Sequence, residues 1–343
     1  MPTIEKKAVR KILLIKLRGI GDVILSTIVV ENLLLDFPDA EIHYLTEKPS
    51  NFALQENPQI KKIHLFDRKS TWRQFTVLTK IRKEKYDLVF DFFSNSMTAM
   101  ITYCSGALYR VGFPYKGRKF AYNIYGPPER DKYHQADLHL EALEMAGLSH
   151  SYSNLLFALN TSDYSVITNE LDYVVSSYRL LIGISPSGGW ESKKCDPIKL
   201  AEIADSVNEK YNANIIILWG PGDIEHADNI RKFMKSKSIL APPTDIRQMA
   251  ALISKCSALI ANDSGPMHIS TAVGTPVLSL HGPTDPKLQG PYGDKHEWIN
   301  KDDLDCIICN KLECPRNHEC FLELPIEKIM TKFELLLRKN NLN

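Results

Sequence analysis

The sequence predicts an α/β protein with two doubly wound parallel sheets. Short apolar runs typical of buried strands alternate with segments of helical spacing, and the same alternation restarts near residue 180. Alternating strands and helices favour parallel sheets that are covered by helices on both faces. A length of 343 residues fits two domains. We expect a first domain over 1–160, a connection over 161–179, a second domain over 180–324 and a closing helix over 325–343.

The first domain contains five apolar runs that we expect to form strands. They cover residues 11–17, 41–45, 60–66, 86–91 and 109–113. Between them, apolar residues recur with helical spacing, which predicts helices over 21–37, 71–84 and 134–146. Gly147 follows the last of these helices and is expected to end it, because glycine readily adopts the left-handed conformation of a helix C-terminus.

In the second domain the same pattern predicts four strands and five helices. The strands are expected over 180–185, 214–219, 258–261 and 276–280. The helices are expected over 197–211, 224–234, 245–255, 267–273 and 325–339. Asp196 and Pro197 open the first of these helices as N-cap and first-turn residue.

The composition and charge indicate the cellular location of the protein and the kind of partner that it binds. No apolar stretch approaches the ~18 residues that a membrane-spanning helix needs, and the charged N-terminus lacks the apolar core of a signal peptide. We therefore expect a cytoplasmic protein. The first 160 residues are basic and the remainder is acidic. A basic half suits an anionic acceptor or a membrane surface, although ordinary scatter of surface charge would give the same balance.

The most informative run is Asn-Asp-Ser-Gly-Pro-Met-His at 262–268, which connects an apolar strand to a short helix. Free N–H groups at a helix N-terminus bind anions. An acidic residue in such a turn fits a ligand with both phosphate and hydroxyl groups, and we expect Asp263 to bind sugar hydroxyls. Backbone N–H groups for phosphate are expected from Ser264, Gly265, Met267 and His268. Because a lone histidine is more often structural, His268 is either a structural residue or part of the binding site.

Together with Ala-Val-Gly-Thr-Pro at 272–276 and His-Gly-Pro-Thr at 281–284, this run resembles the donor site of lipopolysaccharide heptosyltransferases, in glycosyltransferase family nine. The resemblance implies a GT-B arrangement, in which two Rossmann-like domains face a cleft and the last helix returns to the first domain. It also implies an inverting glycosyltransferase that requires no metal for catalysis. The implied donor is ADP-heptose, and the implied acceptor is lipid-linked inner-core oligosaccharide at the inner face of the inner membrane. A different nucleotide sugar, or a non-catalytic protein that binds sugar nucleotides, remains the alternative.

A charged turn, Lys-Leu-Arg-Gly-Ile-Gly-Asp at 16–22, follows the first expected strand. From residue types alone, Asp22 is either a helix cap or a functional carboxylate. The turn resembles the Arg-x-x-Gly-Asp element of the family. This resemblance implies that Asp22 is the base that deprotonates the acceptor hydroxyl and places Arg18 at the acceptor.

The stretch 185–197 combines small residues, which allow close approach to a diphosphate, with two lysines. It is similar to the family's Pro-Gly-Ala…Lys-Arg-Trp-Pro stretch, which implies that Lys193 neutralises the leaving diphosphate beside Ser187 and Gly188. A solvated loop charge is the alternative interpretation of Lys193. By the same resemblance, Glu225 binds the ribose hydroxyls and Thr244 meets the edge of the base. Lysine and a helix N-terminus would then replace Mg²⁺.

Four cations within ten residues mark a basic loop in the first domain. They are Arg110, Lys116, Arg118 and Lys119. Phosphorylated or carboxylated sugars of an acceptor suit such a loop. A nucleic acid would also suit it, but the chain contains no recognisable nucleic-acid-binding module, and we expect no such partner.

Four of the seven cysteines gather in one segment, at Cys306, Cys309, Cys314 and Cys320. In a cytosolic protein such a cluster is more often a metal site than a disulfide framework. The spacing is compatible with a structural Zn²⁺, with His318 as a substitute ligand, and free thiols or disulfides are the alternatives. A metal here would be structural, because four thiolates leave no open coordination position.

Overall fold

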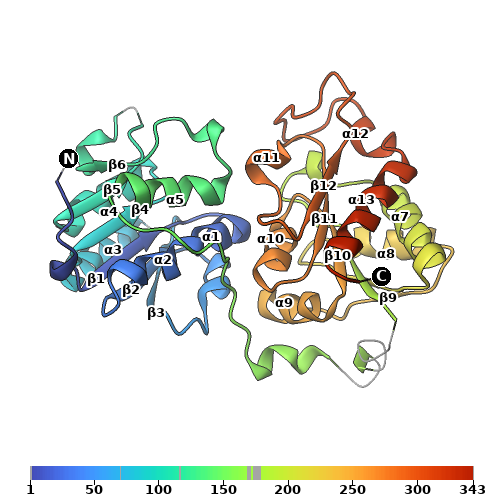
Figure 1. Ribbon diagram of the computed structural model, residues 1–343, viewed down its shortest axis with the longest axis horizontal. Coiled ribbons are helices and arrows are strands. Elements are labelled where there is room, and N and C mark those ends of the chain that lie inside the picture. Colours follow the sequence, from blue (N-terminus) through green and yellow to red (C-terminus); the bar gives the residue numbers. More distant parts are fainter. Residues whose placement is uncertain (1, 70, 116, 168–170, 173–178, 343) are drawn as a thin grey trace. The chain divides into compact units, whose positions relative to one another are not determined.

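The chain forms two compact units, Met1–Ala158 and Leu159–Asn343. The computed structural model describes residues 2–69, 71–115, 117–167, 171–172 and 179–342 (Figure 1). The expected helical middle of the connection falls partly on 168–170 and 173–178, which lie outside the described residues.

In the first unit, a parallel sheet has six strands in the order β3-β2-β1-β4-β5-β6. The strands are β1 (Lys11–Ile15), β2 (Glu41–Thr46), β3 (Ile60–Leu65), β4 (Leu88–Asp91), β5 (Tyr109–Gly112) and β6 (Ile124–Tyr125). The α-helices are α1 (Ile20–Ser26), α2 (Ile28–Asp36), α3 (Thr71–Glu84), α4 (Ser96–Ser105) and α5 (Gln135–Met145). Short 3-10 turns lie at η1 (Lys6–Ala8), η2 (Ser50–Leu54), η3 (Lys119–Ala121) and η4 (Arg130–Lys132).

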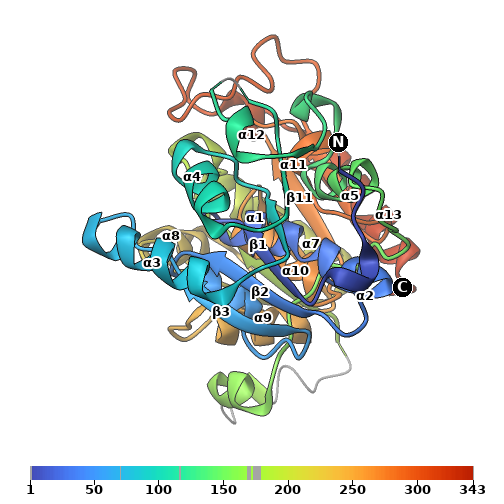
Figure 2. The same cartoon turned by 90° about the vertical axis from the view of Figure 1, so that its left-hand side faces the viewer.

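Helices cover both faces of this sheet. In Figure 2, α3 and α4 lie together on one side of the strands and α2 and α5 on the other. Strand β1 is therefore buried on both faces: Leu13 and Ile15 pack towards α3 and α4, and Ile12 and Leu14 are equally inaccessible. Burial on both faces explains why this strand is a continuous apolar run.

One expected helix, 21–37, is two helices that meet at Thr27. The Thr27 hydroxyl donates to the carbonyl oxygen of Ile24 and accepts from the backbone N–H of Leu156, at 2.6 and 2.8 Å. This contact from a distant segment interrupts the helix where the local pattern continues. It is a tertiary effect that helical spacing does not reveal.

The second unit repeats the design with the strand order β12-β11-β10-β7-β8-β9. Its strands are β7 (Leu181–Ser185), β8 (Asn214–Ile217), β9 (Ser238–Leu240), β10 (Ala258–Asn262), β11 (Val277–His281) and β12 (Glu297–Asn300). Its α-helices are α7 (Pro197–Tyr211), α8 (Ile224–Phe233), α9 (Ile246–Lys255), α10 (Gly265–Ala272), α11 (Pro286–Gln289), α12 (Glu319–Leu322) and α13 (Ile326–Lys339). Two 3-10 turns, η5 (Thr161–Val166) and η6 (Glu191–Lys193), complete it.

The closing helix α13 packs within the second unit. Its apolar face, formed by residues such as Ile329, Phe333 and Leu336, joins the core between the sheet and α7 and α8. In Figure 1, α7, α8 and α13 cover one face of this sheet, and α9 and α10 cover the other. The apolar face of this helix is therefore buried in the second unit, and its return to the first domain stays a prediction.

Both sheets are doubly wound, as predicted. In each one, the first strand of the unit lies beside the fourth, β1 beside β4 and β7 beside β10. Chain connections leave these two central strands in opposite directions, so the loops after them part and leave a crevice where ligands of open α/β sheets bind.

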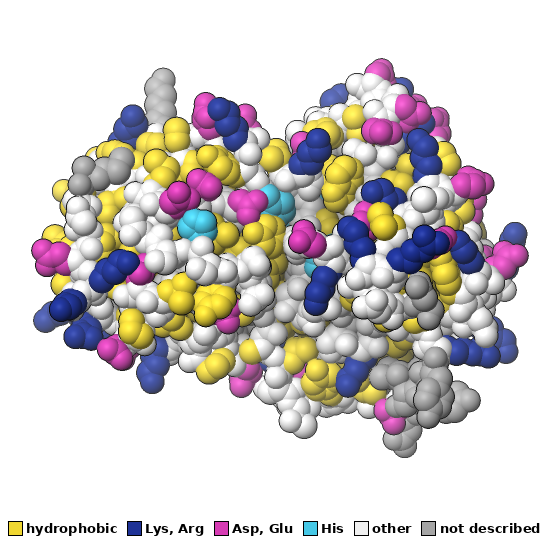
Figure 3. All heavy atoms as spheres, in the orientation of Figure 1, with side chains coloured by type: hydrophobic (Ala, Val, Ile, Leu, Met, Phe, Trp, Pro, Cys, Tyr) yellow, Lys and Arg dark blue, Asp and Glu magenta, His cyan; other side chains and the backbone are white. Residues whose placement is uncertain are grey.

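The surface carries charges of both signs. Figure 3 shows Lys and Arg side chains interspersed with Asp and Glu on both units in the face drawn. Within the described ranges, every helix is too short or too polar to span a bilayer.

Candidate active site

In the second unit, the loops that follow β7 and β10 carry the first group of candidate site residues. Asn262 ends β10 and ties the two loops together. Its amide nitrogen donates to the Pro186 carbonyl at 2.9 Å, and its amide oxygen accepts from the backbone N–H of Cys195 at 3.4 Å. Asn262 is fully buried, so its role is to hold both loops at the end of the sheet. The sequence analysis did not assign it this role.

Lys193 and Asp263 meet in this crevice. The Nζ atom of Lys193 lies 2.7 Å from Oδ2 of Asp263, and the two side chains are 11% and 6% exposed. Thr284 donates its hydroxyl to the same carboxylate oxygen at 2.5 Å. Lys193 also lies over the Trp190 ring, 4.4 Å from its centroid. A lysine with an aromatic and a carboxylate partner is held in place, and this excludes the interpretation of Lys193 as a solvated loop charge.

The electrostatics favour an ionised Asp263. Burial alone would raise the pKa of this carboxyl, but His281, Lys193 and Thr284 outweigh burial and hold the pKa below its usual value. Burial also lowers the pKa of His281 to about 4, so this histidine is neutral near pH 7. Its Nε2 atom pairs with the Ser279 hydroxyl at 2.9 Å. The charges at the centre of the crevice are therefore one ammonium and one carboxylate.

Asp223 organises a second group of side chains beside this pair. It accepts from the Ser187 hydroxyl at 2.8 Å and lies 2.7 Å from the Nζ atom of Lys194. Gly188 makes this arrangement possible, because a Cβ atom there would lie 2.7 Å from the Cγ atom of Lys194. Ser187, Gly188 and Lys194 therefore form one structural cluster. Asp223 was missed by the sequence analysis, which assigned it no role in the Gly/Pro turn after β8.

The N-terminus of α10 lies at the end of the same crevice. Ser264 is the N-cap residue in extended conformation, and its hydroxyl bonds back to the Asn262 carbonyl at 3.1 Å. Pro266 has no N–H group, so the N–H groups of the first turn that lack an acceptor within the helix are those of Gly265 and Met267. His268 is the fourth residue of α10, where the backbone N–H ordinarily bonds to the N-cap carbonyl. The Met267 side chain is in the core, and Met267 can contribute only its backbone. The anion-binding role of this turn stays a prediction.

Glu225 and Thr244 lie farther along the same edge of the sheet. Glu225 is exposed in the first turn of α8, after β8. Thr244 directly precedes Asp245, the N-cap of α9, four residues after β9 ends. Its hydroxyl oxygen is buried and has no hydrogen-bond partner among the described residues. Both positions are compatible with contacts to a nucleoside, and neither role is tested by the geometry.

In the first unit, the turn after β1 carries Asp22. The residue lies in the first turn of α1, whereas Gly19 is the N-cap, so Asp22 is not the cap. Gly19 has a φ of 74°, and a Cβ atom there would lie 2.4 Å from Asp22 Oδ2, so glycine is required. The Lys16 ammonium lies 3.3 Å from Asp22 Oδ1, with side chains 2% and 48% exposed. Asp22 is therefore an accessible carboxylate that is paired with a buried cation.

Two further charged residues surround this position. Asp91 ends β4 and is buried, and burial raises its pKa, although the Ser94 N–H and Tyr122 hydroxyl partly offset this. Arg130 lies over the rings of Phe113 and Tyr115, at 5.4 and 5.3 Å from their centroids.

Arg130 adds a cation beside the predicted base. Burial lowers its pKa, and the charges of Asp22 and Asp91 partly reverse this shift. Its Nε atom is buried without a hydrogen-bond partner in the described part of the chain. The sequence analysis missed Arg130, since it lies outside the basic loop and only folding brings it near Asp22.

The residues of the basic loop do not share one role. Arg110 donates to the carbonyl oxygens of Ala121 and Ala107, at 2.9 and 2.6 Å, and so holds the backbone around β5. These contacts use two of its five N–H donors, and its role at the acceptor stays a prediction. Arg118 donates to the Ser94 carbonyl at 3.1 Å and therefore lies near the end of β4. Of the remaining predicted acceptor residues, Arg18 and Lys119 are exposed, and Lys116 lies outside the described residues.

All seven cysteines are free thiols. Cys306, Cys309, Cys314 and Cys320 line one small cavity that also contacts Ser192. In the described part of the chain, no three His, Cys, Asp or Glu side chains are already arranged to hold a metal ion. The predicted substitute ligand His318 instead lies 2.9 Å from Glu191, through its Nε2 atom.

Two doubly wound units, one of them with a buried lysine–aspartate pair beside a helix N-terminus, are the architecture of GT-B glycosyltransferases. The model of glycosyltransferase family 9 (heptosyltransferase) matches residues 75–319. The chain therefore belongs to glycosyltransferase family 9, and the predicted resemblance and enzyme class are confirmed.

Curated relatives agree with this assignment. Lipopolysaccharide heptosyltransferase 3 of Escherichia coli K12 is 25% identical over 92% of this chain and 95% of its own length. The lipopolysaccharide core heptosyltransferase OpsX of Haemophilus influenzae is also 25% identical, over 84% of this chain and 83% of its own.

Solved structures share the fold. A family 9 glycosyltransferase from Veillonella parvula has a TM-score of 0.84 and 24% identity, and the match covers 96% of this chain and 97% of the other. The E. coli heptosyltransferase WaaC with ADP has a TM-score of 0.73 and 14% identity, over 95% and 99% of the two chains. These matches confirm the predicted fold class.

Proposed function

We propose that this enzyme transfers a heptose from ADP-heptose to the inner-core oligosaccharide of lipopolysaccharide. The observation that carries the proposal is the Lys193–Asp263 pair at the switch point of a doubly wound sheet, beside the N-terminus of α10. Related proteins support the choice of substrates. The curated relatives are named lipopolysaccharide heptosyltransferases, and one similar structure holds ADP-2-deoxy-2-fluoro heptose.

The second unit is proposed to bind the donor. The diphosphate lies against the N–H groups of Gly265 and Met267 and takes Lys193 as its cation. Asp263, freed from Lys193 by this exchange, accepts hydrogen bonds from sugar hydroxyls. Glu225 then serves the ribose, and Thr244 contributes to binding of the base.

The first unit is proposed to bind the acceptor. Asp22 removes the proton from an acceptor hydroxyl, and the resulting oxygen attacks the anomeric carbon from the face opposite the diphosphate, so the configuration inverts. Lys16 holds the Asp22 carboxylate in orientation before it accepts the proton. Arg18, Arg118 and Lys119, with Lys116, serve the anionic acceptor, and Arg130 adds a partly buried cation near Asp22.

The leaving diphosphate is proposed to depart without a catalytic metal ion. Lys193 and the α10 N-terminus supply positive charge where negative charge develops. The chain does contain one Asp-x-Asp sequence, Asp303 to Asp305, but both carboxylates are exposed and pair with Lys301 and Arg316. Brief exposure to EDTA is expected to leave transfer unchanged, whereas strict dependence on added Mg²⁺ would contradict this scheme.

A lipid-linked acceptor would place the enzyme in the cytoplasm, in peripheral contact with the inner membrane. Binding to vesicles with anionic lipid, and its loss at high salt, would support this location.

One experiment separates the proposal from its alternatives. Purified protein is incubated with a panel of nucleotide sugars and delipidated core acceptors, and products are identified by mass spectrometry. A heptosylated product with inverted configuration supports the proposal. Transfer from a different nucleotide sugar would indicate a related enzyme with another donor. Binding of ADP-heptose with neither transfer nor hydrolysis would indicate a non-catalytic binding protein.

A further inference from the structure

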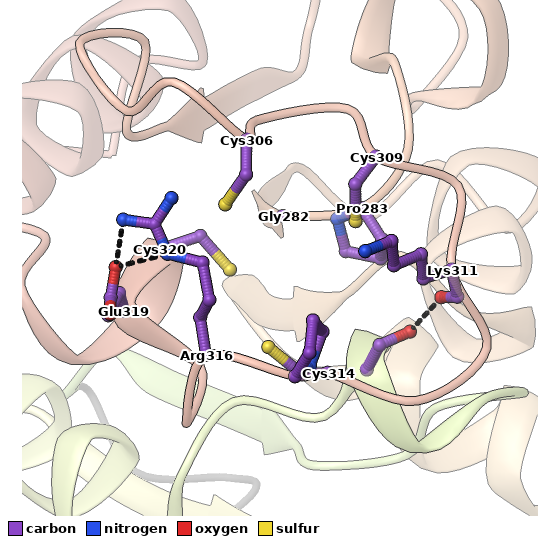
Figure 4. A pocket seen from close by; sticks show the side chains of 11 residues that line it. Gly282, Pro283, Cys306, Cys309, Lys311, Cys314, Arg316, Glu319 and Cys320 are labelled. Carbon is purple, nitrogen blue, oxygen red and sulfur yellow. Dashed lines mark hydrogen bonds and ion pairs between the residues drawn. The ribbon is translucent and has the colours of Figure 1, made fainter.

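A cluster of four thiols lies directly behind the loop that carries Lys193. Figure 4 shows the side chains of Cys306, Cys309, Cys314 and Cys320 around one cavity. The cavity measures about 50 Å³ and is also lined by Lys311, Arg316 and Glu319, of which Arg316 and Glu319 pair with each other. Four thiols around a space of this size match the donor set of a tetrahedral thiolate site, and Lys311 adds a positive charge beside them.

The backbone around the cavity is held in an unusual conformation. Ile308, inside the Cys-x-x-Cys turn, has a φ of 61°, although a β-branched residue disfavours this region. The turn is fixed to the end of β11, because Ile308 donates to Gly282 and Asn310 donates to Pro283, at 3.0 and 2.8 Å. Strain of this kind persists only where the surroundings impose it, and it is common at ligand sites.

One thiol already has the hydrogen bond that a metal thiolate needs. The backbone N–H of His318 points to Cys314 Sγ at 3.3 Å. A donor aimed at sulfur stabilises a thiolate more than a thiol, because the thiolate carries the negative charge. This contact and the strained turn are independent of the cysteine spacing that first indicated a metal.

We propose that the four cysteines bind one Zn²⁺ ion as thiolates and that this ion holds the Lys193 turn in its donor-binding position. Each thiol releases one proton on binding, and four thiolates around Zn²⁺ leave a net charge of −2, which Lys311 faces. Binding requires the four sulfur atoms to move closer together, since no three His, Cys, Asp or Glu side chains among the described residues are placed to hold a metal ion. The ion takes no part in the chemical step.

Direct contacts connect the cysteine segment to the Lys193 turn. Ser192 donates its backbone N–H to the Leu312 carbonyl at 3.1 Å and its hydroxyl to the Lys311 carbonyl at 2.5 Å. Glu191 accepts from the backbone N–H of Cys314 at 3.0 Å. Residues 191 and 192 of η6 are therefore anchored to the loop between the second and third cysteines, and Lys193 directly follows.

A second connection reaches Asp263. The Cys-x-x-Cys turn bonds to Gly282 and Pro283, and the next residue, Thr284, donates to Asp263. A Cβ atom at Gly282 would lie 2.6 Å from Cys320 Sγ, which shows how closely this backbone approaches the thiols. The cysteine segment is thus connected by hydrogen bonds to the backbone next to Lys193 and to the residue before Thr284, which contacts Asp263.

Metal content tests the site without reference to activity. Protein purified without chelator is analysed for metals, and its thiols are titrated before and after release of the ion by an organomercurial. We expect about one zinc per chain and four thiols that become reactive only after release. One iron per chain in place of zinc would support the thiolate site and would show that the bound ion is iron. Less than about 0.2 metal per chain, or disulfides within the segment, would overturn the site.

Nucleotide affinity tests the support of Lys193, and this part rests on the proposed function. Calorimetry with ADP compares the zinc-loaded protein, the metal-free protein and the metal-free protein after zinc is restored. We expect about tenfold weaker binding without the ion, with recovery on reloading. Unchanged ADP affinity in a metal-free, folded protein would overturn the support role.

Variants separate the two parts. Cys306→Ser with Cys309→Ser should lose both the metal and ADP affinity, whereas Cys104→Ser, in α4 of the first unit, should lose neither. Glu191→Ala should keep the metal but weaken ADP binding. Lys193→Ala should also keep the metal. If neither the wild type nor any variant binds ADP while the metal is present, the proposed function is wrong and the metal site is still supported.

Discussion

The Nζ atom of Lys193 lies 2.7 Å from Oδ2 of Asp263, so the cation assigned to the diphosphate already has a carboxylate partner. If the diphosphate takes Lys193, as proposed, donor binding exchanges one ionic contact for another. This exchange protects a buried lysine from being left unpaired in the empty site, where an uncompensated charge is costly. It also links the phosphate and sugar ends of the donor, because Asp263 becomes free for hydroxyl groups only when phosphate takes Lys193.

Replacing Lys193 by alanine is expected to weaken ADP binding about ten- to a hundred-fold, since a charged hydrogen bond contributes on the order of 1.5–3 kcal/mol. Lys194→Ala should weaken it much less, because Lys194 is committed to Asp223. Calorimetry with ADP measures both. Equal losses in the two variants would contradict the assignment of Lys193.

A double variant controls for stability in this experiment. Lys193→Ala leaves the buried Asp263 carboxylate without its cation, which lowers stability as well as affinity. Lys193→Ala combined with Asp263→Asn should restore the thermal midpoint towards wild type but should not restore ADP affinity. Recovery of affinity would show that Lys193 acts only through folding.

Replacing Asp22 by asparagine should lower kcat by roughly 10²–10⁴, the usual contribution of a general base. ADP affinity should not change, because Asp22 belongs to the first unit and the donor loops belong to the second. The fold should also be retained, since Gly19, not Asp22, is the N-cap of α1. Steady-state transfer assays and calorimetry check the two parts, and near-wild-type turnover would leave Asp22 with a purely local role.

Only some of the cations in the basic loop are expected to contribute to acceptor binding. Arg118→Ala with Lys119→Ala should raise the acceptor KM and reduce its salt dependence, with ADP affinity unchanged. Arg110→Ala should lower the thermal midpoint instead, because Arg110 holds the carbonyls of Ala107 and Ala121. If the double variant impairs ADP binding as strongly as acceptor binding, the division of roles between the units is wrong.

The parts of the fold that the sequence predicted are those with strong local signals. The strand β10 and helix α10 differ from their expected bounds by one or two residues, since an apolar run, a small-residue turn and Pro266 mark them. Helix α4 was missed, although Asn95 and Thr98 form a capping box at its start. Its apolar residues do not form a clear stripe. Strand β12 was missed because its sequence, Glu-Trp-Ile-Asn, is not a continuous apolar run.

The site was predictable where a motif carried it and not where folding assembled it. Asp22, Lys193 and Asp263 stand in recognisable runs, and the structure brings Lys193 and Asp263 together. Lys16 and Thr284 also stand in two of these runs, but the runs do not show that they contact Asp22 and Asp263 respectively. Pairings of this kind depend on the tertiary structure, and no spacing along the chain encodes them.

The pair of Asp163 and Arg247 should give the second unit a measurable dependence on pH. Arg247 donates to both carboxylate oxygens, at 2.8 and 2.5 Å. Burial alone would raise the pKa of Asp163, but Arg247 and the Asn160 N–H outweigh it, so the folded pKa is below the usual value. The unfolded chain then binds the proton more tightly than the folded chain. The contribution of the pair to the free energy of unfolding is therefore complete above about pH 4 and is lost as pH falls through the folded pKa.

Asp163→Asn should lower the free energy of unfolding by about 3 kcal/mol at pH 7, because Arg247 loses its buried partner. It should also flatten the dependence of this free energy on acid pH. Urea unfolding from pH 7 to pH 3 measures both, with Asp228→Asn, at an exposed pair, as the control. Wild-type acid sensitivity in Asp163→Asn would show that another group is responsible.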